Sequence, residues 1–389
     1  MTGRLRFIAP GALRMMVRGS SMSDKQKACV GIGSVQRLGT EAAWLGQCAL
    51  LVTGRTALRR AGTTDLLIQL LGEAGVEVEV FDEVPPEPDV GTVDRARERL
   101  RQAGSDLVVE AGGGSALDVG KAAAALAKVE APTAEYHEGR DLPADGLPHI
   151  AVPTTAGSGA EATPNSVLID AGRTLKKSIR GAGLLPDVCV VDAALTVSCP
   201  PALTAASGMD ALSQAIESYL SLHASAASER MSLRAVALIV PNLPIAYARG
   251  NDLAAREGMC EGSYKAGVAL AAARLGAVHG IAHPLGLFYE LPHGVVCAAL
   301  LPHVLRRNRD AVVEKYAHLS DAMGADPVEK VEELLSELSL PGMIGPYPDA
   351  DQERAIMDYA IPSGSSRANP VPVNEDFVRG ILRAVCKSL

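Results

Sequence analysis

The chain has 389 residues, of which 48% are hydrophobic and 21% charged, which is long enough for two or three domains with well-filled cores. Its net charge of −8 and aromatic content of 3% argue against a nucleic-acid binder, which needs a basic face and stacking side chains. The seven cysteines are odd in number and form no CxxC pair, which argues against a disulfide framework and for a reducing cytoplasm.

The N-terminal segment is basic. Arg4, Arg6, Arg14 and Arg18 precede the first acidic residue, Asp24. This pattern is compatible with an organelle-targeting presequence, but we favour a simple N-terminal extension or an edge strand. Farther along, no uninterrupted apolar run approaches the roughly 18 residues that cross a bilayer. We therefore expect a cytoplasmic protein with no membrane or nucleic-acid partner.

The first half of the chain alternates short apolar runs with stretches of helical periodicity. The predicted strands are Cys48–Thr53, Val76–Phe81, Asp106–Glu110, His149–Val152 and Val188–Val191. Helices are predicted over Asp65–Ala74 and Val93–Ala103, the second followed by a glycine where a C-terminal cap belongs. Such alternation is typical of a parallel sheet covered on both faces. Residues 1–190 are therefore predicted to form a Rossmann-like α/β domain.

The second half is dominated by alanine-rich helical runs. The predicted helices are Leu203–Ser221, Ser225–Leu238, Leu253–Leu275, Ala311–Met323, Val328–Leu338 and Glu375–Lys387. This part of the sequence has no strand-like alternation and no internal repeat. Residues 191–389 are therefore predicted to form an all-α domain, with the boundary near 185–198.

A glycine-rich turn follows the third predicted strand. Gly112, Gly113, Gly114 and Ser115 lead into a helix that carries Asp118 one turn later. Glycines let a ligand approach the backbone closely, and a helix N-terminus offers free N–H groups to a phosphate. The turn is therefore a candidate anion-binding loop.

A second polar loop follows the next predicted strand. Thr154, Thr155 and Ser158 supply hydroxyls among glycines that permit a tight turn. Loops after neighbouring parallel strands meet at the carboxyl edge of the sheet, where open α/β sheets bind ligands. Together the two loops predict a dinucleotide site.

The end of the first predicted strand bears on the choice of dinucleotide. An acidic residue there would bond the ribose 2′-hydroxyl and repel a 2′-phosphate. Gly54 occupies this place, with Arg55 beside it. We therefore expect NAD or NADP, with NADP tolerated or favoured, although Arg55 could simply be solvated.

Three of the eight histidines lie within fifteen residues, in apolar sequence punctuated by glycine and proline. They are His279, His283 and His293. Histidine is the commonest metal ligand and carries protons near neutral pH. The cluster predicts a buried metal site or acid–base site, and so an enzyme.

Several motifs now combine into one resemblance. In chain order they are Gly112–Lys121, Pro153–Glu161, Gly208–Leu212, His279–Gly286, Pro292–Gly294 and Ser365–Pro370. Motifs of this kind and order resemble those of the iron-containing (group III) alcohol dehydrogenases, over essentially the whole chain. The histidine run is most similar to that of the members that reduce lactaldehyde or oxidise 1,2-propanediol. The resemblance implies a dinucleotide domain facing an all-helical domain, the fold shared with dehydroquinate synthase.

The resemblance also implies a site and a reaction. The metal, Fe²⁺ or Zn²⁺, would be bound by Asp210, the residue at position 214, His279 and His293. His283 would carry a proton near the nicotinamide. The expected reaction is hydride transfer between NAD(P) and a small alcohol or aldehyde, by a homodimer or larger homo-oligomer.

Position 214 departs from the family pattern, because Gln214 stands where a histidine is usual. Asp210 and Gln214 are four residues apart on a predicted helix, so their side chains reach the same side. A glutamine oxygen is a weaker ligand than imidazole, but three good ligands and an open position are enough for catalytic zinc. We expect a retained, weaker site that is better suited to Zn²⁺ than to Fe²⁺.

Other functions stay open at this point. The principal alternative is a metal-independent reductase of a carboxylated carbonyl compound, similar to maleylacetate reductase. A sugar-phosphate cyclising lyase on the same fold would need more basic residues in the cleft motifs. A non-catalytic scaffold is disfavoured by the intact glycine loops and by His279 and His293.

Overall fold

A six-stranded parallel sheet forms the centre of the first half. The structure is a computed structural model that describes residues 26–170 and 175–387, so the basic N-terminal segment lies outside it. The strands are β1 (Lys27–Val30), β2 (Cys48–Gly54), β3 (Glu77–Val84), β4 (Leu107–Gly112), β5 (His149–Pro153) and β8 (Val188–Val191). Their order is β1-β8-β5-β4-β2-β3, and every neighbouring pair is parallel. The predicted Rossmann-like sheet is confirmed.

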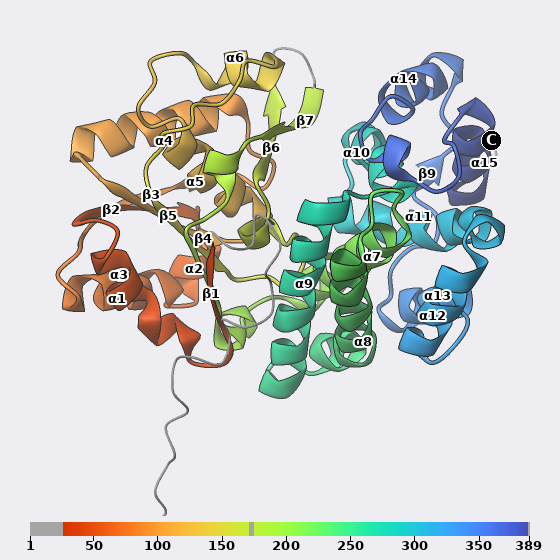
Figure 1. The fold of residues 1–389 in the computed structure, drawn as a ribbon, viewed down its shortest axis with the longest axis horizontal. Helices are drawn as coiled ribbons and strands as arrows, with labels where there is room; N and C mark the ends of the chain where they lie inside the picture. Colours follow the sequence, from red (N-terminus) through yellow and green to blue (C-terminus); the bar gives the residue numbers. More distant parts are fainter. Residues whose placement is uncertain (1–25, 171–174, 388–389) are drawn as a thin grey trace, which may run out of the picture.

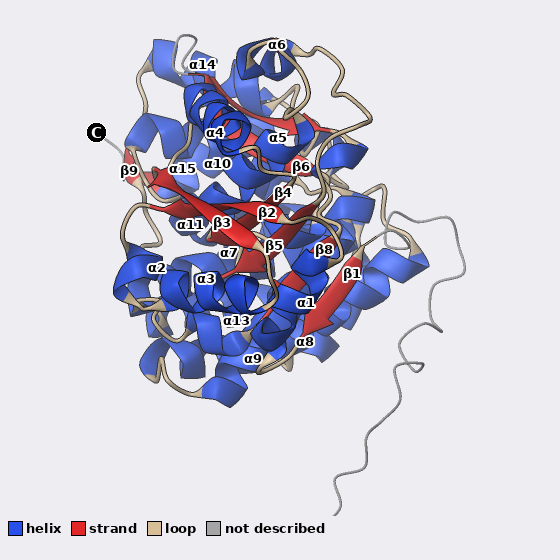
Figure 2. Cartoon of the chain, turned by 90° about the vertical axis from the view of Figure 1, so that its left-hand side faces the viewer, coloured by secondary structure: helices blue, strands red, loops and turns tan. Residues whose placement is uncertain are grey.

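Helices cover both faces of this sheet (Figure 2). On one face, α1 (Leu38–Ala43) and α3 (Thr63–Glu73) share an apolar cluster with Val109 of β4. On the other face, α4 (Val90–Ala103) and α5 (Gly114–Ala125) pack with Val108. Every residue of β4 and β5 is buried, which explains their continuous apolar sequence.

Smaller elements of this half were not predicted from the sequence. They are the edge strand β1, the short helices α2 (Ala57–Arg60) and α6 (Thr133–Glu138), and the antiparallel hairpin of β6 (Asn165–Asp170) and β7 (Leu175–Arg180). Within the hairpin, β6 is amphipathic, because its residues alternate between buried and partly buried positions. Its polar partner strand gives little apolar signal.

The second half is helical and lies beside the sheet-containing half (Figure 1). Its helices are α7 (Pro201–Leu220), α8 (Ala226–Ala248), α9 (Leu253–Ala273), α10 (Ala277–Tyr289), α11 (His293–Asn308), α12 (Val313–Met323), α13 (Pro327–Glu337), α14 (Ala350–Ala360) and α15 (Glu375–Val385). One apolar core joins α7 through α15. The expected helical half is confirmed, with one addition: the two-residue strands β9 (Gly345–Pro346) and β10 (Cys386–Lys387) pair beside α15.

Prolines misled the sequence prediction of three helices. The predicted helix that ended at Leu238 continues to Ala248, through Pro241 and Pro244. The histidine run was not predicted as helical, yet it forms α10 and α11, with Pro284 and Pro302 inside them. Proline removes one backbone N–H and so weakens an isolated helix. Here the helices are held by tertiary packing, which sequence propensity does not include.

Helix α8 is apolar because it is packed between other helices. In the part of the chain that the structure describes, α8 could cross a membrane by length and composition alone, as could the bent pair α9–α10 if it were one span. However, α8 packs along α7 and α9, and Ala235, Val236 and Ile239 belong to the helical core. Its apolar sequence is thus accounted for by contacts within the protein.

The order of the strands creates a topological switch point at one edge of the sheet, where an open α/β sheet is expected to have a crevice. From β2 the chain passes outward to β3 and then returns to β4 on the other side of β2. Thr53 of β2 pairs with Ala111 of β4, so Gly54 and Gly112 leave the sheet side by side. Open α/β sheets bind ligands at such a switch point, beyond the carboxyl ends of the strands.

Helices α7 and α11 approach so closely that only glycine fits between them. An ideal Cβ on Gly294 would lie 2.1 Å from the carbonyl oxygen of Ala206. We predict that Gly294→Ala pushes α11 away from α7 and lowers the free energy of unfolding by about 1–3 kcal/mol. Thermal or denaturant unfolding measures this change. Gly342→Ala is the control, because nothing lies within 4 Å of its ideal Cβ; equal stability of the two variants would contradict the prediction.

Candidate functional site

Three of the predicted site residues converge where α7, α10 and α11 meet. Asp210 is in the middle of α7, His279 is in the first turn of α10, and His293 begins α11. Oδ1 of Asp210 lies 3.1 Å from Nε2 of His279 and 3.7 Å from Nε2 of His293. One carboxylate oxygen therefore faces two imidazole nitrogens, and this arrangement can hold a divalent cation.

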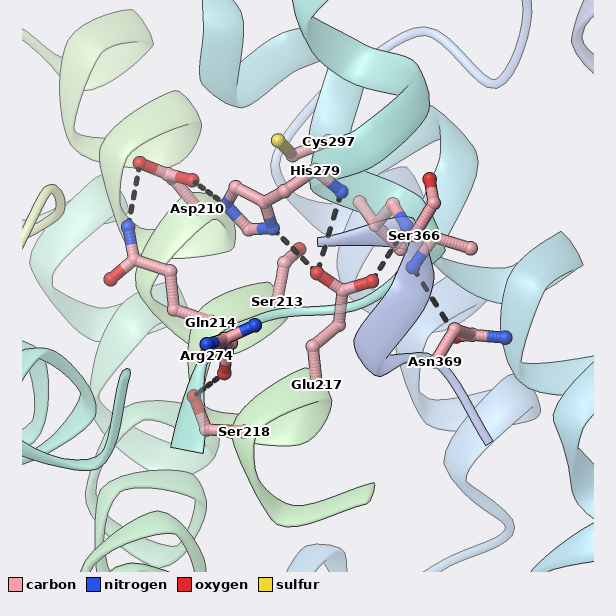
Figure 3. A network of polar contacts seen from close by, with 12 residues as sticks. Asp210, Ser213, Gln214, Glu217, Ser218, Arg274, His279, Cys297, Ser366 and Asn369 are labelled. Atoms are coloured by element: carbon pink, nitrogen blue, oxygen red, sulfur yellow. Dashed lines mark hydrogen bonds and ion pairs between the residues drawn. The ribbon is translucent and has the colours of Figure 1, made fainter. Parts of the chain in front are cut away.

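A second carboxylate fixes the imidazole of His279 from behind. Oε2 of Glu217 lies 2.6 Å from Nδ1 of His279, and Oε1 accepts the backbone N–H of Val278 at 2.6 Å (Figure 3). Glu217 thus caps the N-terminus of α10 and also orients the ring. Because Nδ1 is bonded to this carboxylate, Nε2 is directed at the cluster. A carboxylate is a usual outer-sphere partner of a metal-binding histidine.

Gln214 links this cluster to the polar loop after β5. Its Nε2 donates to Oδ2 of Asp210 at 3.1 Å and to the carbonyl oxygen of Ser158 at 3.3 Å. Its Oε1 is buried and has no hydrogen-bond partner. Gln214 therefore orients Asp210 through the oxygen that does not face the histidines.

His283 lies one turn after His279 on α10. Its ring centroid is 5.0 Å from that of His293, and its buried Nδ1 has no partner. Burial and the nearby charges of His279, Lys176 and Arg180 lower the pKa of His283 to about 3. The ring is thus neutral near pH 7.

The sequence analysis missed Cys297. Its thiol is fully buried, and Sγ lies 3.5 Å from Nε2 of His293, one helical turn away on α11. Asp210, His279, His293 and Cys297 each offer a ligand atom, and these four atoms all lie within 4.8 Å of one another. Cys297 follows His293 by four residues, and this spacing places the two side chains on one face of a helix. It becomes informative only when α11 is known to be helical.

The charges of this cluster oppose one another. Burial alone disfavours the imidazolium of His279, but Cys297, Asp210 and Glu217 raise its pKa well above the ordinary value. Burial, together with His283 and His279, lowers the pKa of His293 well below it. Burial raises the pKa of the Cys297 thiol to about 11. The two buried carboxylates of Asp210 and Glu217 thus share the single positive charge of His279. A further cation in the cluster would therefore be stabilised electrostatically.

The two predicted dinucleotide loops touch each other. The backbone N–H of Thr154 donates to the carbonyl of Gly112 at 2.8 Å. An ideal Cβ on Gly113 would lie 3.5 Å from Oγ1 of Thr155, and one on Gly114 would lie 3.1 Å from Oγ of Ser158. No side chain caps the N-terminus of α5. The loops therefore form a continuous backbone surface that ends at a helix N-terminus.

Gly112 needs to be a glycine for two reasons. Its φ is +149°, and an ideal Cβ on it would lie 2.8 Å from Cβ of Ala116. A side chain at this position would be strained and would clash with Ala116, so glycine is what allows the chain to turn sharply from β4 into α5.

Two predicted cofactor residues have their polar groups occupied within the domain. The hydroxyl of Ser115 donates to the carbonyl of Pro86. Asp118 is buried and hydrogen-bonded to the backbone of Val167, and burial, opposed by Lys121, raises its pKa to about 6. Their contact with a cofactor stays a prediction.

Gly54 ends β2, and Arg55 beside it is exposed. Nε of Arg55 makes one long contact of 3.4 Å, with the carbonyl oxygen of Glu83. The neighbouring Arg59 forms an ion pair with Asp82 at 3.0 Å. Arg55 thus keeps most of its donors available beside the switch point of the sheet.

A continuous chain of contacts connects the loops with the histidine cluster. Gly114 lies against Ser158, the carbonyl of Ser158 accepts from Gln214, and Gln214 also donates to Asp210. The loop after β5 also packs tightly on the helical half, since an ideal Cβ on Gly159 would lie 2.6 Å from Cα of Gly267 in α9. The loops of the first half and the histidine cluster of the second half are therefore connected by direct contacts.

Comparisons with known proteins agree with this arrangement. Residues 25–193 match the family model described as iron-containing alcohol dehydrogenase, and residues 204–386 match its C-terminal part. The chain is 36% identical to long-chain-alcohol dehydrogenase 1 of Geobacillus thermodenitrificans, over 91% of this chain and 94% of that protein. It is 37% identical to 1,3-propanediol dehydrogenase of Klebsiella pneumoniae, over 87% and 91%. A solved structure of a 1,3-propanediol oxidoreductase superposes with a TM-score of 0.87 at 34% identity, covering 92% of this chain and 97% of that one.

The role of Glu217 can be tested by removing its charge while keeping its size. We predict that Glu217→Gln weakens metal binding about 10- to 100-fold, because the imidazole of His279 loses its anionic partner. Affinity is measured by competition with a chromophoric chelator. The control is Glu229→Gln, whose carboxylate pairs with Lys315 on the surface of α8. Unchanged affinity in Glu217→Gln would show that this carboxylate does not support a metal site.

Proposed function

The chain belongs to the iron-containing alcohol dehydrogenase family, and on that premise we propose that it transfers a hydride reversibly between NAD(P) and a small alcohol or aldehyde, at a metal site in its helical half that faces the dinucleotide loops of the first half. The observation that carries this proposal is the convergence of Asp210, His279 and His293 beside the loop that contains Ser158.

The donor set fits a divalent metal. Asp210, His279 and His293 offer one carboxylate oxygen and two imidazole nitrogens, which suit both Fe²⁺ and Zn²⁺. Gln214 is the further ligand candidate on α7, through its unpartnered Oε1. When bound, the metal supplies a Lewis acid that stabilises negative charge on the substrate oxygen. The protein's part is to hold the three donors in place, through Glu217 behind His279 and Gln214 behind Asp210.

His283 is the proposed proton carrier. Its Nδ1 is buried and has no hydrogen-bond partner, so this nitrogen is available to the hydroxyl proton of an alcohol. In the reverse direction the same nitrogen returns a proton to the carbonyl oxygen. Its place next to His293 puts it at the edge of the cluster where a substrate would bind.

The dinucleotide is proposed to lie along the two loops. Its pyrophosphate would bind the backbone of Gly112, Gly113 and Gly114 at the N-terminus of α5, where no side chain competes. Hydroxyls of Thr154, Thr155 and Ser158 would orient the rest of the molecule toward Asp210. This direction follows from the contact between Ser158 and Gln214.

We propose that NADP is tolerated or favoured over NAD. Gly54 brings no negative charge to the ribose, and Arg55 retains free donors for a 2′-phosphate. We also propose that the enzyme is cytoplasmic and a homodimer or larger, with its domains divided near residue 190. All seven cysteines are unpaired, which suits a reducing compartment. β8 ends at Val191 and α7 begins at Pro201, on either side of that division.

The metal-independent reductase of a carboxylated carbonyl compound is not favoured. The relatives reported above are alcohol and propanediol dehydrogenases. The cluster of carboxylate and imidazole groups could also hold a metal ion, and a metal-independent enzyme would not need such a cluster. The same relatives argue against a lyase or a scaffold.

Removal of the metal tests the proposed reaction. We predict that exhaustive chelation lowers aldehyde-dependent oxidation of NAD(P)H by about 100-fold or more, because the oxyanion loses its main electrostatic stabiliser. Adding Fe²⁺ or Zn²⁺ back should restore the rate. The assay uses a panel of short aldehydes with NADH and NADPH, and metal content is measured on the same samples. A metal-free sample that keeps full activity would refute the Lewis-acid role.

The coenzyme preference can be reversed at Gly54. An ideal Cβ there meets only the carbonyl oxygen of Val84, at 3.9 Å, so a side chain fits. We predict that Gly54→Asp raises KM for NADPH about tenfold or more and leaves KM for NADH unchanged or lower, since like charges in contact cost several kcal/mol. Gly54→Asn, equal in size but neutral, is the control. If both variants change the two KM values alike, Gly54 does not read the 2′-position.

A further inference from the structure

The buried thiol of Cys297 faces the candidate metal site and has no role in the function proposed so far. Cys297 follows His293 by one turn of α11, so both side chains leave the same side of the helix. Its Sγ is 3.5 Å from Nε2 of His293, and it is one of the four ligand atoms that lie within 4.8 Å of one another. A thiol aimed at two imidazoles and a carboxylate is more than a packing residue.

Gln214 is turned away from this group. Its Nε2 is committed to Asp210 and to the carbonyl of Ser158. Its Oε1 faces the loop after β5, where an ideal Cβ on Gly159 would lie 3.4 Å from it. Figure 3 shows this oxygen on the far side of the amide from His279. The residue at position 214 thus orients Asp210 and leaves one place in the donor set to be filled.

Three of the six separations among the ligand atoms of Asp210, His279, His293 and Cys297 are close to those of a tetrahedral centre. Zinc bonds of about 2.0 Å to nitrogen or oxygen and about 2.3 Å to sulfur place neighbouring ligand atoms roughly 3.3–3.6 Å apart. The separations from Asp210 Oδ1 to the two imidazole nitrogens are 3.1 and 3.7 Å, and that from His293 to Cys297 is 3.5 Å. Small shifts of the side chains bring all four to one ion.

Building on the metal site in the proposed function, we propose that Cys297, rather than Gln214, supplies the fourth ligand, and that the site binds Zn²⁺ in preference to Fe²⁺. The substrate oxygen would then be a fifth ligand, since catalytic zinc can expand to five-coordination. Metal binding breaks the S–H bond, forms a metal–thiolate bond and releases one proton to solvent. A thiolate is a soft ligand that selects zinc over the harder cations. It also makes the donor set dianionic, which matches the charge of the ion.

Cobalt(II) reports thiolate ligation without any assay of activity. The apoprotein is loaded with one equivalent of Co²⁺, and its absorption is recorded with that of Cys297→Ser. We expect a near-ultraviolet thiolate-to-cobalt charge-transfer band in the native chain. The serine variant should lack the band and bind Co²⁺ roughly 10- to 100-fold more weakly, at least the loss that an outer-sphere partner causes. Cys260→Ser, a buried cysteine on α9 outside the cluster, should keep the band.

The outcomes separate this inference from the proposed function. Stoichiometric Co²⁺ without the band in the native chain, or a band that persists in Cys297→Ser, overturns thiolate ligation while the metal site stands. Failure of the native chain to bind any Co²⁺ overturns both. If Cys297→Ser does not fold, the spectrum of the native chain still decides the question.

A competition experiment tests the choice of metal. The apoprotein is equilibrated anaerobically with equal excesses of Fe²⁺ and Zn²⁺, and the bound metals are measured. We expect zinc to exceed iron by at least about tenfold in the native chain, and this ratio to fall in Cys297→Ser. Iron in excess in the native chain would overturn the proposed preference.

Discussion

The site depends on one buried carboxylate whose two oxygens have different partners. Oδ1 of Asp210 faces the imidazoles of His279 and His293, and Oδ2 accepts the amide of Gln214. A carboxylate in this position needs positive charge, because leaving it unpaired would cost several kcal/mol. Glu217 adds a second buried carboxylate behind His279. The protein therefore places an excess of negative donors around a small volume, which a divalent cation would neutralise.

Close backbone contacts hold this carboxylate beside the dinucleotide loops. Gly294 lets α11, and so His293, approach α7. Gly159 and Gly267 let the loop after β5 meet α9, where neither backbone leaves room for a side chain. Gln214 bonds both this loop and Asp210, so one side chain joins the loop to the cluster.

The sequence predicted the architecture better than the details of the site. The buried strands β4 and β5 and the glycines after them were recognisable, because continuous apolar runs and glycine turns are local signals. The histidine run was recognised as chemistry but not as two helices, since Pro284 and Pro302 conceal the helical periodicity. For the same reason Cys297 could not be placed one turn from His293. The bond between Gln214 and Ser158 joins residues 56 positions apart, and no local pattern predicts it.

The most direct test of this account is anomalous X-ray scattering from crystals of the metal-loaded protein, with data collected on both sides of the absorption edge of the bound metal. The account predicts a single strong peak within about 2.3 Å of Asp210, His279 and His293, the distance of metal–ligand bonds. A fully loaded protein whose peak lies elsewhere, away from these three side chains, would contradict it.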